Sequence, residues 1–157
     1  KRQGRLHRNF QGYSTQPDCD LIALGVSAIG RVGATYSQNV KTLDEYYDAI
    51  NHGHLPIVRG LALTRDDLVR RAVIMALMCQ GEVLFEPVEQ SWLIDFRRYF
   101  EAELQQLEEM AEQGLVKVGA EGIEVTTMGW FFVRGVAMVF DKYLQADRNR
   151  ARFSRII

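Results

Sequence analysis

The spacing of apolar residues divides the chain into two parts. In the first part, Asp20 to Ile29, DLIALGVSAI, is a nearly continuous apolar run bounded by polar residues and glycine. Such a run predicts a strand that is buried on both faces of a parallel sheet, with ligands expected at its carboxyl end. Thr42 and Glu45 then form a capping box, which predicts a helix that ends near Gly53.

Beyond this unit, residues 54–60 contain one proline and one glycine and are predicted to form a linker. The apolar positions then take a helical spacing. Thr64 is a suitable N-cap, with Asp66 and Asp67 in the first turn, where carboxylates favour the helix dipole. Gly81 marks the expected end of this helix. The expected domains are residues 1–53, the linker 54–60 and a mainly helical domain 61–157.

The rest of the second domain is predicted to contain short helices and one hairpin. The expected elements are a strand in GEVLFE, helices around 89–96 and 98–113, a hairpin of LVKV and GIEVT, and an apolar helix from Thr127 to about Leu144. Helices with a two-stranded wing indicate a winged-helix-like module. The fold class expected from the residues is therefore α/β followed by mainly α.

Winged-helix modules often bind DNA with a helix in the major groove. Here the longer predicted helix carries a series of acidic residues, Glu101, Glu103, Glu108, Glu109 and Glu112. Phosphates would repel this helix, so the pattern disfavours nucleic-acid binding and favours packing against a neighbouring domain.

Composition and charge narrow the function further. The 157 residues are 47% hydrophobic and carry a net charge of −1, which permits a core and gives no general attraction to nucleic acid or anionic membranes. The run 128–140 is too short to span a bilayer and contains Arg134. Cys19 and Cys79 have no disulfide or metal-binding spacing, which favours a soluble protein of the reducing cytoplasm. The start KRQGRLHRNF, with neither Met nor a signal region, is typical of a fragment of a longer protein.

Candidate chemistry is sparse. Gly25, Gly30 and Gly33 have neither the dinucleotide nor the P-loop spacing. The small residues near them permit either the close approach of a flat ligand or tight packing. These residues are Gly25, Ser27, Ala28 and Gly30. A polar group, Gln11, Tyr13, Ser14 and Thr15, is either a solvated loop or the rim of a site. The histidines, His7, His52 and His54, lack carboxylates at metal-ligand spacing, and both cysteines are expected to be small buried hydrophobes. No catalytic residue and no metal ligand is predicted.

The stretches HRNFQGYSTQPDCDLIALGVSAIG, YSQN, RGLALTRDDLVRR and FSRII together resemble the carboxyl-terminal third of the oxygen-independent coproporphyrinogen III oxidases, which are radical S-adenosylmethionine enzymes. The resemblance extends over essentially the whole chain. It implies that residues 1–53 are the closing strand and helix unit of a partial β/α barrel, with Asp20 to Ile29 as the last strand. Residues 61–157 would then be a helical, winged-helix-like cover of the active site.

The resemblance also implies an activity. The family uses a deoxyadenosyl radical to decarboxylate two propionates of coproporphyrinogen III oxidatively, which gives the vinyl groups of protoporphyrinogen IX. The implied cofactors are S-adenosylmethionine and a [4Fe–4S] cluster held by a C-x-x-x-C-x-x-C motif. Because this chain has only two cysteines, it is expected to be inactive alone and to have the upstream barrel of the same protein as its partner.

Two residues take a binding role from the resemblance. Gln11, in NFQGY, and Ile29, in GVSAI, match positions at which the family binds a second S-adenosylmethionine. Four arginines, Arg5, Arg8, Arg152 and Arg155, are looser candidates for steering an anionic substrate. The alternatives are a non-catalytic module that binds S-adenosylmethionine or a tetrapyrrole, and a winged-helix interaction module.

Overall fold

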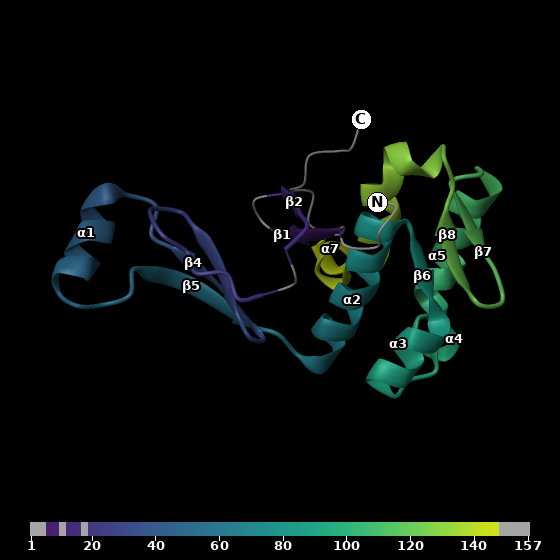
Figure 1. Cartoon of the computed structure of the whole chain (residues 1–157), viewed down its shortest axis with the longest axis horizontal. Helices are drawn as coiled ribbons and strands as arrows, with labels where there is room; N and C mark the ends of the chain where they lie inside the picture. The colour runs from purple at the N-terminus through teal and green to yellow at the C-terminus, as the bar shows by residue number, and fades with distance from the viewer. Residues whose placement is uncertain (1–5, 10–11, 17–18, 148–157) are drawn as a thin grey trace.

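An arm and a helical module make up the computed structural model, which describes residues 6–9, 12–16 and 19–147 (Figure 1). The arm contains β3 (Ile29–Val32), β4 (Thr35–Asn39), α1 (Leu43–Asn51) and β5 (Ile57–Ala62). A short ribbon of β1 (His7–Asn9) and β2 (Gly12–Ser14) lies between the arm and the module. The described chain is thus a mixture of helices and antiparallel sheets.

The sheet of the arm has the order β3-β4-β5, and both of its strand pairs are antiparallel. Val32 pairs with Thr35, so only Gly33 and Ala34 separate β3 from β4. Gly33 has a φ of +54°, a value that tight hairpin turns require and that glycine adopts without a steric cost.

The predicted strand Asp20 to Ile29 is wrong. Gly25 and Ser27 have φ values of +93° and +60°, so the chain turns there instead of extending. Asn39, which is 3% exposed, holds this loop because its side-chain amide donates hydrogen bonds to the carbonyl oxygens of Ala23, at 3.3 Å, and Gly25, at 2.9 Å. The apolar run therefore marks a loop beside an antiparallel sheet.

The predicted N-cap of α1 is confirmed, because the side chain of Thr42 accepts from the Glu45 amide. The Glu45 carboxylate accepts from the hydroxyl of Thr42, at 2.6 Å, instead of making the reciprocal backbone bond of a full capping box. The linker predicted at residues 54–60 is wrong at its end. Residues 57–60 belong to β5, where Gly60 pairs with Ser37 and Arg59 with Gln38. Backbone pairing joins this segment to the sheet of the arm.

In the module, α2 (Arg65–Gln80) begins and ends where the sequence predicted. Thr64 and Asp67 form a reciprocal capping box, and Gly81 is the left-handed cap at the end, with a φ of +79°. The elements after α2 are β6 (Glu82–Leu84), α3 (Phe85–Trp92), α4 (Phe96–Tyr99), α5 (Glu101–Glu112), β7 (Val116–Val118) and β8 (Gly122–Val125). The strands form an antiparallel sheet of order β6-β8-β7, which confirms the predicted hairpin. The helix predicted around residues 89–96 is displaced, because α3 begins at Phe85.

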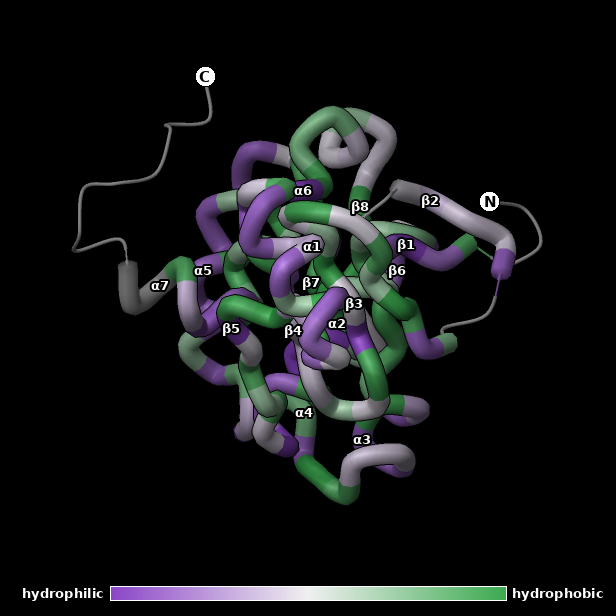
Figure 2. The backbone as a smooth tube through the Cα atoms, turned by 90° about the vertical axis from the view of Figure 1, so that its left-hand side faces the viewer, coloured by the Kyte–Doolittle hydropathy of each residue, from purple (hydrophilic) through white to green (hydrophobic). Residues whose placement is uncertain are grey.

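The core of the described chain lies in this module, between α2, α5 and the sheet. Three buried rings pack against one another, with 4.8 Å between the centres of Phe96 and Phe100, which are tilted, and 5.3 Å between those of Phe100 and Phe140, which meet edge to face. The arm contributes none of the residues of this core. Its strand β5 carries both hydrophobic and hydrophilic residues along the whole strand, and all of them are exposed (Figure 2).

The continuous helix predicted from Thr127 to about Leu144 is wrong as well. The segment forms a 3₁₀ turn (Gly129–Phe132), α6 (Val133–Met138) and α7 (Lys142–Asp147). Gly129 packs directly against the backbone of Leu115, which fixes the turn. Asp141 then starts α7, since its carboxylate accepts from the amides of Tyr143, at 3.0 Å, and Leu144, at 3.2 Å.

Candidate functional site

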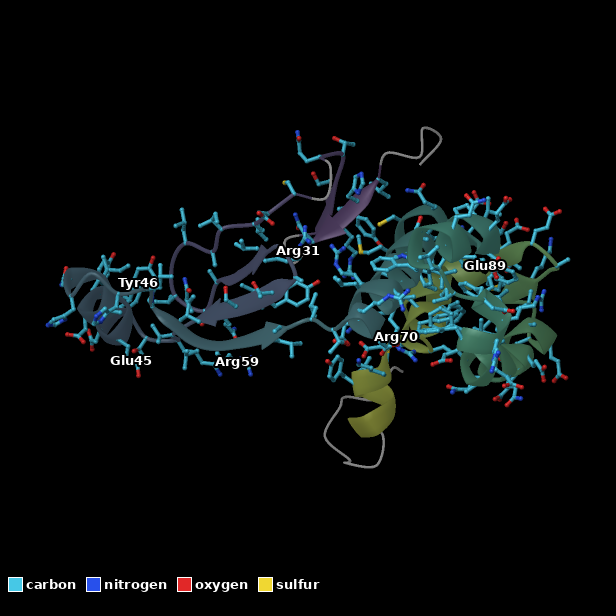
Figure 3. All side chains as sticks on the ribbon, turned by 90° about the horizontal axis from the view of Figure 1, so that it is seen from below. Arg31, Glu45, Tyr46, Arg59, Arg70 and Glu89 are labelled. Carbon is cyan, nitrogen blue, oxygen red and sulfur yellow. The ribbon has the colours of Figure 1, made fainter. Side chains whose placement is uncertain are left out.

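A cavity of about 530 Å³ lies where the arm meets the helical module. Its walls come from the β1–β2 ribbon, the sheet of the arm, α2 and residues 140–143 at the start of α7. Figure 3 shows Arg31 and Arg70 on the two sides of this junction, whereas Arg59 and Tyr46 lie farther out along the arm. Parts of the chain that are distant in sequence therefore meet at one site, which we call the junction cavity.

Basic side chains outnumber acidic ones around the junction cavity. The basic residues that line it are Arg8, Arg31, Arg70, Arg71 and Lys142, and the acidic ones are Asp67 and Asp141. Hydrogen bonds within the chain orient two of the arginines. Arg31 donates to the carbonyl oxygen of Cys19 at 2.7 Å, and Nε of Arg71 donates to the hydroxyl of Tyr36 at 3.0 Å. The cavity is therefore built to favour anions.

An ion-pair network forms the wall on the module side. Arg70 contacts Asp66 at 3.0 Å and Glu103, on α5, at 2.6 Å. Lys142, at the start of α7, contacts Asp66 at 2.8 Å and Asp67 at 2.6 Å. The aspartates predicted as helix-start charges thus also join α2 to α5 and α7.

The network changes the protonation of both aspartates. Burial raises the pKa of Asp67, but hydrogen bonds from Lys142 and Thr64 outweigh burial and hold this pKa far below its ordinary value of 3.8. The pKa of Asp66 is lowered in the same way, with burial opposed by Lys142, Tyr99 and Arg70. Hydrogen bonds to both aspartates raise the pKa of Lys142. All three groups are therefore charged at neutral pH.

Replacing Lys142 by Met should lower the free energy of unfolding at pH 7 by about 1–2 kcal/mol, because the Asp67 carboxylate loses a charged partner at a side chain that is only 5% exposed. Since the pKa of each aspartate is lower in the folded chain than in the unfolded one, this stabilisation is complete above about pH 4 and is lost as the pH falls below it. Urea unfolding at pH 7 and pH 3 measures the change.

The matched control is Lys117→Met, because Lys117 is 73% exposed and its nitrogen lies 4.0 Å from Glu124. Its effect should be close to zero at both pH values. A Lys142→Met effect of the same size at pH 7 and pH 3 would contradict the assigned charge network.

Ile29 lies at the start of β3, where it is partly buried and pairs with Gln38. It lines a second, smaller hollow of about 270 Å³, formed mainly by the loop of residues 21–28. Leu21 lines both this hollow and the junction cavity, so the two sites adjoin. Gln11, the other residue predicted to bind the cofactor, lies outside the described residues, as do Arg5, Arg152 and Arg155.

The small residues beside Ile29 serve packing within the chain. A Cβ on Gly30 would lie 2.9 Å from the carbonyl oxygen of Leu21 and 3.2 Å from the side chain of Ala23, so this glycine admits the neighbouring loop. Gly25 serves a turn and receives support from Tyr46, whose hydroxyl accepts from its amide at 3.0 Å. The tight-packing interpretation applies to Gly30, whereas a Cβ on Gly25 would meet nothing within 4 Å, so Gly25 serves the turn alone.

The other members of the predicted polar group have different surroundings. Ser14 lines the junction cavity, and Thr15 is exposed. The Tyr13 hydroxyl donates to the carbonyl oxygen of Met78 at 3.5 Å, which ties the ribbon to α2. Its ring lies 5.6 Å from the guanidinium of Arg8, the one terminal arginine of the predicted set that the structure describes. Ser14 thus lines the junction cavity, and Tyr13 contacts Arg8, which also lines it.

The histidines and cysteines do not gather at one place. His7 lines the junction cavity, whereas His52 and His54 are exposed at the end of α1. Cys79 is buried as predicted, but Cys19 is exposed beside the cavity, because the segment before β3 is a surface loop. Within the described ranges, no group of three or more His, Cys, Asp or Glu residues is arranged to hold a metal ion.

Arg31, Arg71 and Lys142 were missed as site residues by reasoning from the sequence. Arg71 lies in the stretch RDDLVRR. The spacing of four residues between Asp66 and Arg70 predicts their ion pair, but it does not show which way the side chain of Arg71 points. Lys142 and Asp66 are 76 residues apart in the sequence, and no local pattern predicts their contact.

Comparisons with known proteins identify relatives that are similar over nearly the whole chain. Residues 63–132 match the family model described as HemN C-terminal domain. The oxygen-independent coproporphyrinogen III oxidase of Pseudomonas aeruginosa is 48% identical over 154 residues, which is 98% of this chain and 33% of that protein. The protein of the same name from Escherichia coli is 45% identical over 157 residues, which is 100% of this chain and 34% of that protein. The resemblance inferred from the sequence is confirmed.

A solved structure agrees with this. The coproporphyrinogen III oxidase (HemN) of Escherichia coli, described as a radical SAM enzyme, superimposes with a TM-score of 0.87 at 46% identity. The superposition covers 90% of this chain and 33% of that chain. The present chain thus spans about a third of the length of the relatives it matches. In the part of it that the structure describes, none of the helices combines the length and the apolar character needed to cross a membrane.

Proposed function

Since this chain corresponds in sequence and fold to the carboxyl-terminal third of the oxygen-independent coproporphyrinogen III oxidases, we propose that it acts as that third of such an enzyme. The enzyme would oxidatively decarboxylate two propionates of coproporphyrinogen III to the vinyl groups of protoporphyrinogen IX, in the cytoplasm. The observation that carries the proposal is the similarity over essentially the whole chain, at 45–48% identity and a TM-score of 0.87. The chain would supply the cofactor rim and the cover of the site.

This role assigns binding rather than radical chemistry to the present residues. A [4Fe–4S] cluster is held by cysteine thiolates, and the chain contains only Cys19, which is exposed, and Cys79, which is buried. These residues do not fit the cluster, whose binding region lies outside this chain. The described side chains would bind and orient the substrate and exclude water from it.

Gln11 and Ile29 would form the rim for S-adenosylmethionine. An amide at position 11 can bond to the amino-acid end or the adenine edge of the cofactor, and Ile29 can pack on its ring. Ile29 supports this proposal because it lines the apolar hollow next to the junction cavity. The cofactor would thus sit beside the cavity that takes the substrate.

The arm would be the edge that joins the barrel of the same protein. Large apolar side chains are exposed on it without a core beneath them: Leu24, Leu43, Tyr47, Ile57 and Val58. Apolar surface of this kind favours burial against another part of a protein. We therefore assign it to the contact with the barrel, where the antiparallel strands β3, β4 and β5 would extend the barrel sheet.

The second domain would be a winged-helix-like cover. Its order of elements, α2, β6, α3, α4–α5, β7, β8, with the sheet order β6-β8-β7, supports this proposal. The helix α5 carries exposed glutamates, including Glu108 and Glu109, so its partner would be protein rather than nucleic acid. The cover would follow the predicted linker of residues 54–60, and the end of β5 at Ala62 and the start of the family match at residue 63 support a boundary close to this point.

A chimera tests this function. Replacing the carboxyl-terminal third of the Escherichia coli oxidase by this chain should give an enzyme that forms protoporphyrinogen IX from coproporphyrinogen III. The control is the same Escherichia coli enzyme without its last third, which should form no product. A chimera that shows the iron–sulfur absorption and cleaves S-adenosylmethionine, but leaves the substrate unchanged, would contradict the proposal.

A further inference from the structure

We propose that the junction cavity binds propionate carboxylates of the tetrapyrrole substrate, and that Arg8, Arg31 and Arg71 are the residues that receive them. The inference rests on the proposed function, because it takes the substrate class from it. It adds the location of the substrate in this chain and the side chains that recognise it.

Charge is the first argument. Two of the five basic residues at the cavity, Arg70 and Lys142, are balanced by the carboxylates of Asp66, Asp67 and Glu103 at distances of 2.6–3.0 Å. Those pairs hold the helices together. The basic residues that line the cavity outnumber the acidic ones by five to two, which makes it attractive to carboxylates. We assign ligand recognition to Arg8, Arg31 and Arg71, because Arg70 and Lys142 serve the contacts between helices.

Their placement is the second argument. Arg8 comes from β1, Arg31 from β3 and Arg71 from α2, so the guanidinium groups reach the cavity from three separate elements. A ring that carries several carboxylates on its rim presents charges that are likewise spread apart. Arg31 and Arg71 have contacts within the chain that orient them, and a guanidinium with five N–H donors can keep such a contact and still bind a carboxylate.

The cavity also fits the apolar body of a tetrapyrrole. Between the arginines it is lined by Leu21, Leu61, Leu63, Ile74, Met75 and Phe140. Its volume of about 530 Å³ far exceeds that of a carboxylate and lies in the range of sites for organic ligands. A ligand with an apolar ring and an anionic rim therefore matches the lining.

The positive charge of the junction cavity also favours the substrate over the cofactor. S-adenosylmethionine carries a sulfonium and an ammonium against a single carboxylate, so its net charge is positive. Five basic residues against two acidic ones disfavour it in the junction cavity. The adjoining hollow at Ile29, lined by apolar and small residues, has no such charge. We infer that the cavity takes the substrate and the hollow belongs to the cofactor.

Fluorescence titration of the 157-residue chain with coproporphyrin III, a stable tetracarboxylate, tests the assignment. Each of Arg8→Gln, Arg31→Gln and Arg71→Gln should weaken binding by roughly tenfold or more, and Arg71→Lys should recover part of the loss. The matched control is Arg59→Gln, because Arg59 bonds to Gln38 on the arm and does not line the cavity. Binding should also weaken as the salt concentration rises.

Circular dichroism of each variant keeps loss of folding apart from loss of binding. The proposal is overturned if the chain does not bind coproporphyrin III, if it binds the tetramethyl ester equally well, or if the folded arginine variants bind like the wild-type chain. If the chimera described above is active and any of these results is obtained, only the proposed carboxylate site is contradicted. If the chimera is inactive while binding of coproporphyrin III depends on the arginines, only the proposed enzyme function is contradicted.

Discussion

Replacing Phe100 by Ala should lower the free energy of unfolding by about 3–5 kcal/mol. The Phe100 side chain is fully buried, and its ring lies between those of Phe96 and Phe140, at 4.8 Å and 5.3 Å. The guanidinium of Arg70 also lies 5.4 Å from the ring centre. Truncation would therefore leave a cavity at the point where α5, α2 and the segment before α7 meet.

Urea unfolding followed by circular dichroism measures this change. The control is Phe131→Ala, because the Phe131 side chain is 83% exposed and its removal should change the free energy of unfolding by less than about 0.5 kcal/mol. A loss below about 1 kcal/mol for Phe100→Ala would contradict the described core. Because Phe140 also lines the junction cavity, the same variant should bind coproporphyrin III more weakly.

The second large effect is expected for Gly129→Ala. A Cβ at this position would lie 1.8 Å from the carbonyl oxygen of Leu115 and 3.0 Å from the side chain of Val125. The clashing atoms belong to the backbone of Leu115, which cannot move without disturbing the start of β7. We expect a loss of about 3 kcal/mol in the free energy of unfolding, at the upper end of the range for overpacking.

Gly135→Ala is the matched control for this glycine. Gly135 lies within α6, and a Cβ there would meet nothing within 4 Å. Alanine should therefore stabilise the chain by about 0.5–1 kcal/mol, since it favours the helix and restricts the unfolded state. The sign of the two effects should differ in thermal unfolding, and equal effects at positions 129 and 135 would contradict the described packing.

Local chemistry allowed part of this structure to be predicted from the sequence. Thr42, Thr64 and Gly81 act through hydrogen bonds and backbone angles within a few residues of their own position, so the helix ends they mark are correct. The hairpin of β7 and β8 is predictable for the same reason, because apolar alternation on either side of a glycine-containing turn is a local pattern.

The misplaced elements depended on tertiary contacts. The run Asp20 to Ile29 reads as a buried strand, but Asn39 and Tyr46 bind its backbone as a loop. The signal that was available was Gly33, which supports a tight hairpin between IGRV and TYSQN. The 3₁₀ turn before α6 depends on the contact of Gly129 with Leu115, which the apolar pattern does not contain.

Only some residues of the candidate site could be predicted from the sequence. The polar residues before β3 and the position of Ile29 were indicated by the sequence, and Ser14 and Ile29 do line adjoining hollows. The arginines of the junction cavity come together through the fold. Arg31 reaches the carbonyl of Cys19, and Arg71 reaches Tyr36 across 35 positions, so neither direction follows from local spacing.

Carbon dioxide release by the chimera is the measurement closest to the proposed function, because it follows the reaction itself. The Escherichia coli oxidase with this chain as its carboxyl-terminal third should release two molecules of carbon dioxide for each molecule of protoporphyrinogen IX that it forms. A chimera that carries its cluster and cleaves S-adenosylmethionine, yet releases no carbon dioxide from coproporphyrinogen III, would contradict the proposed function.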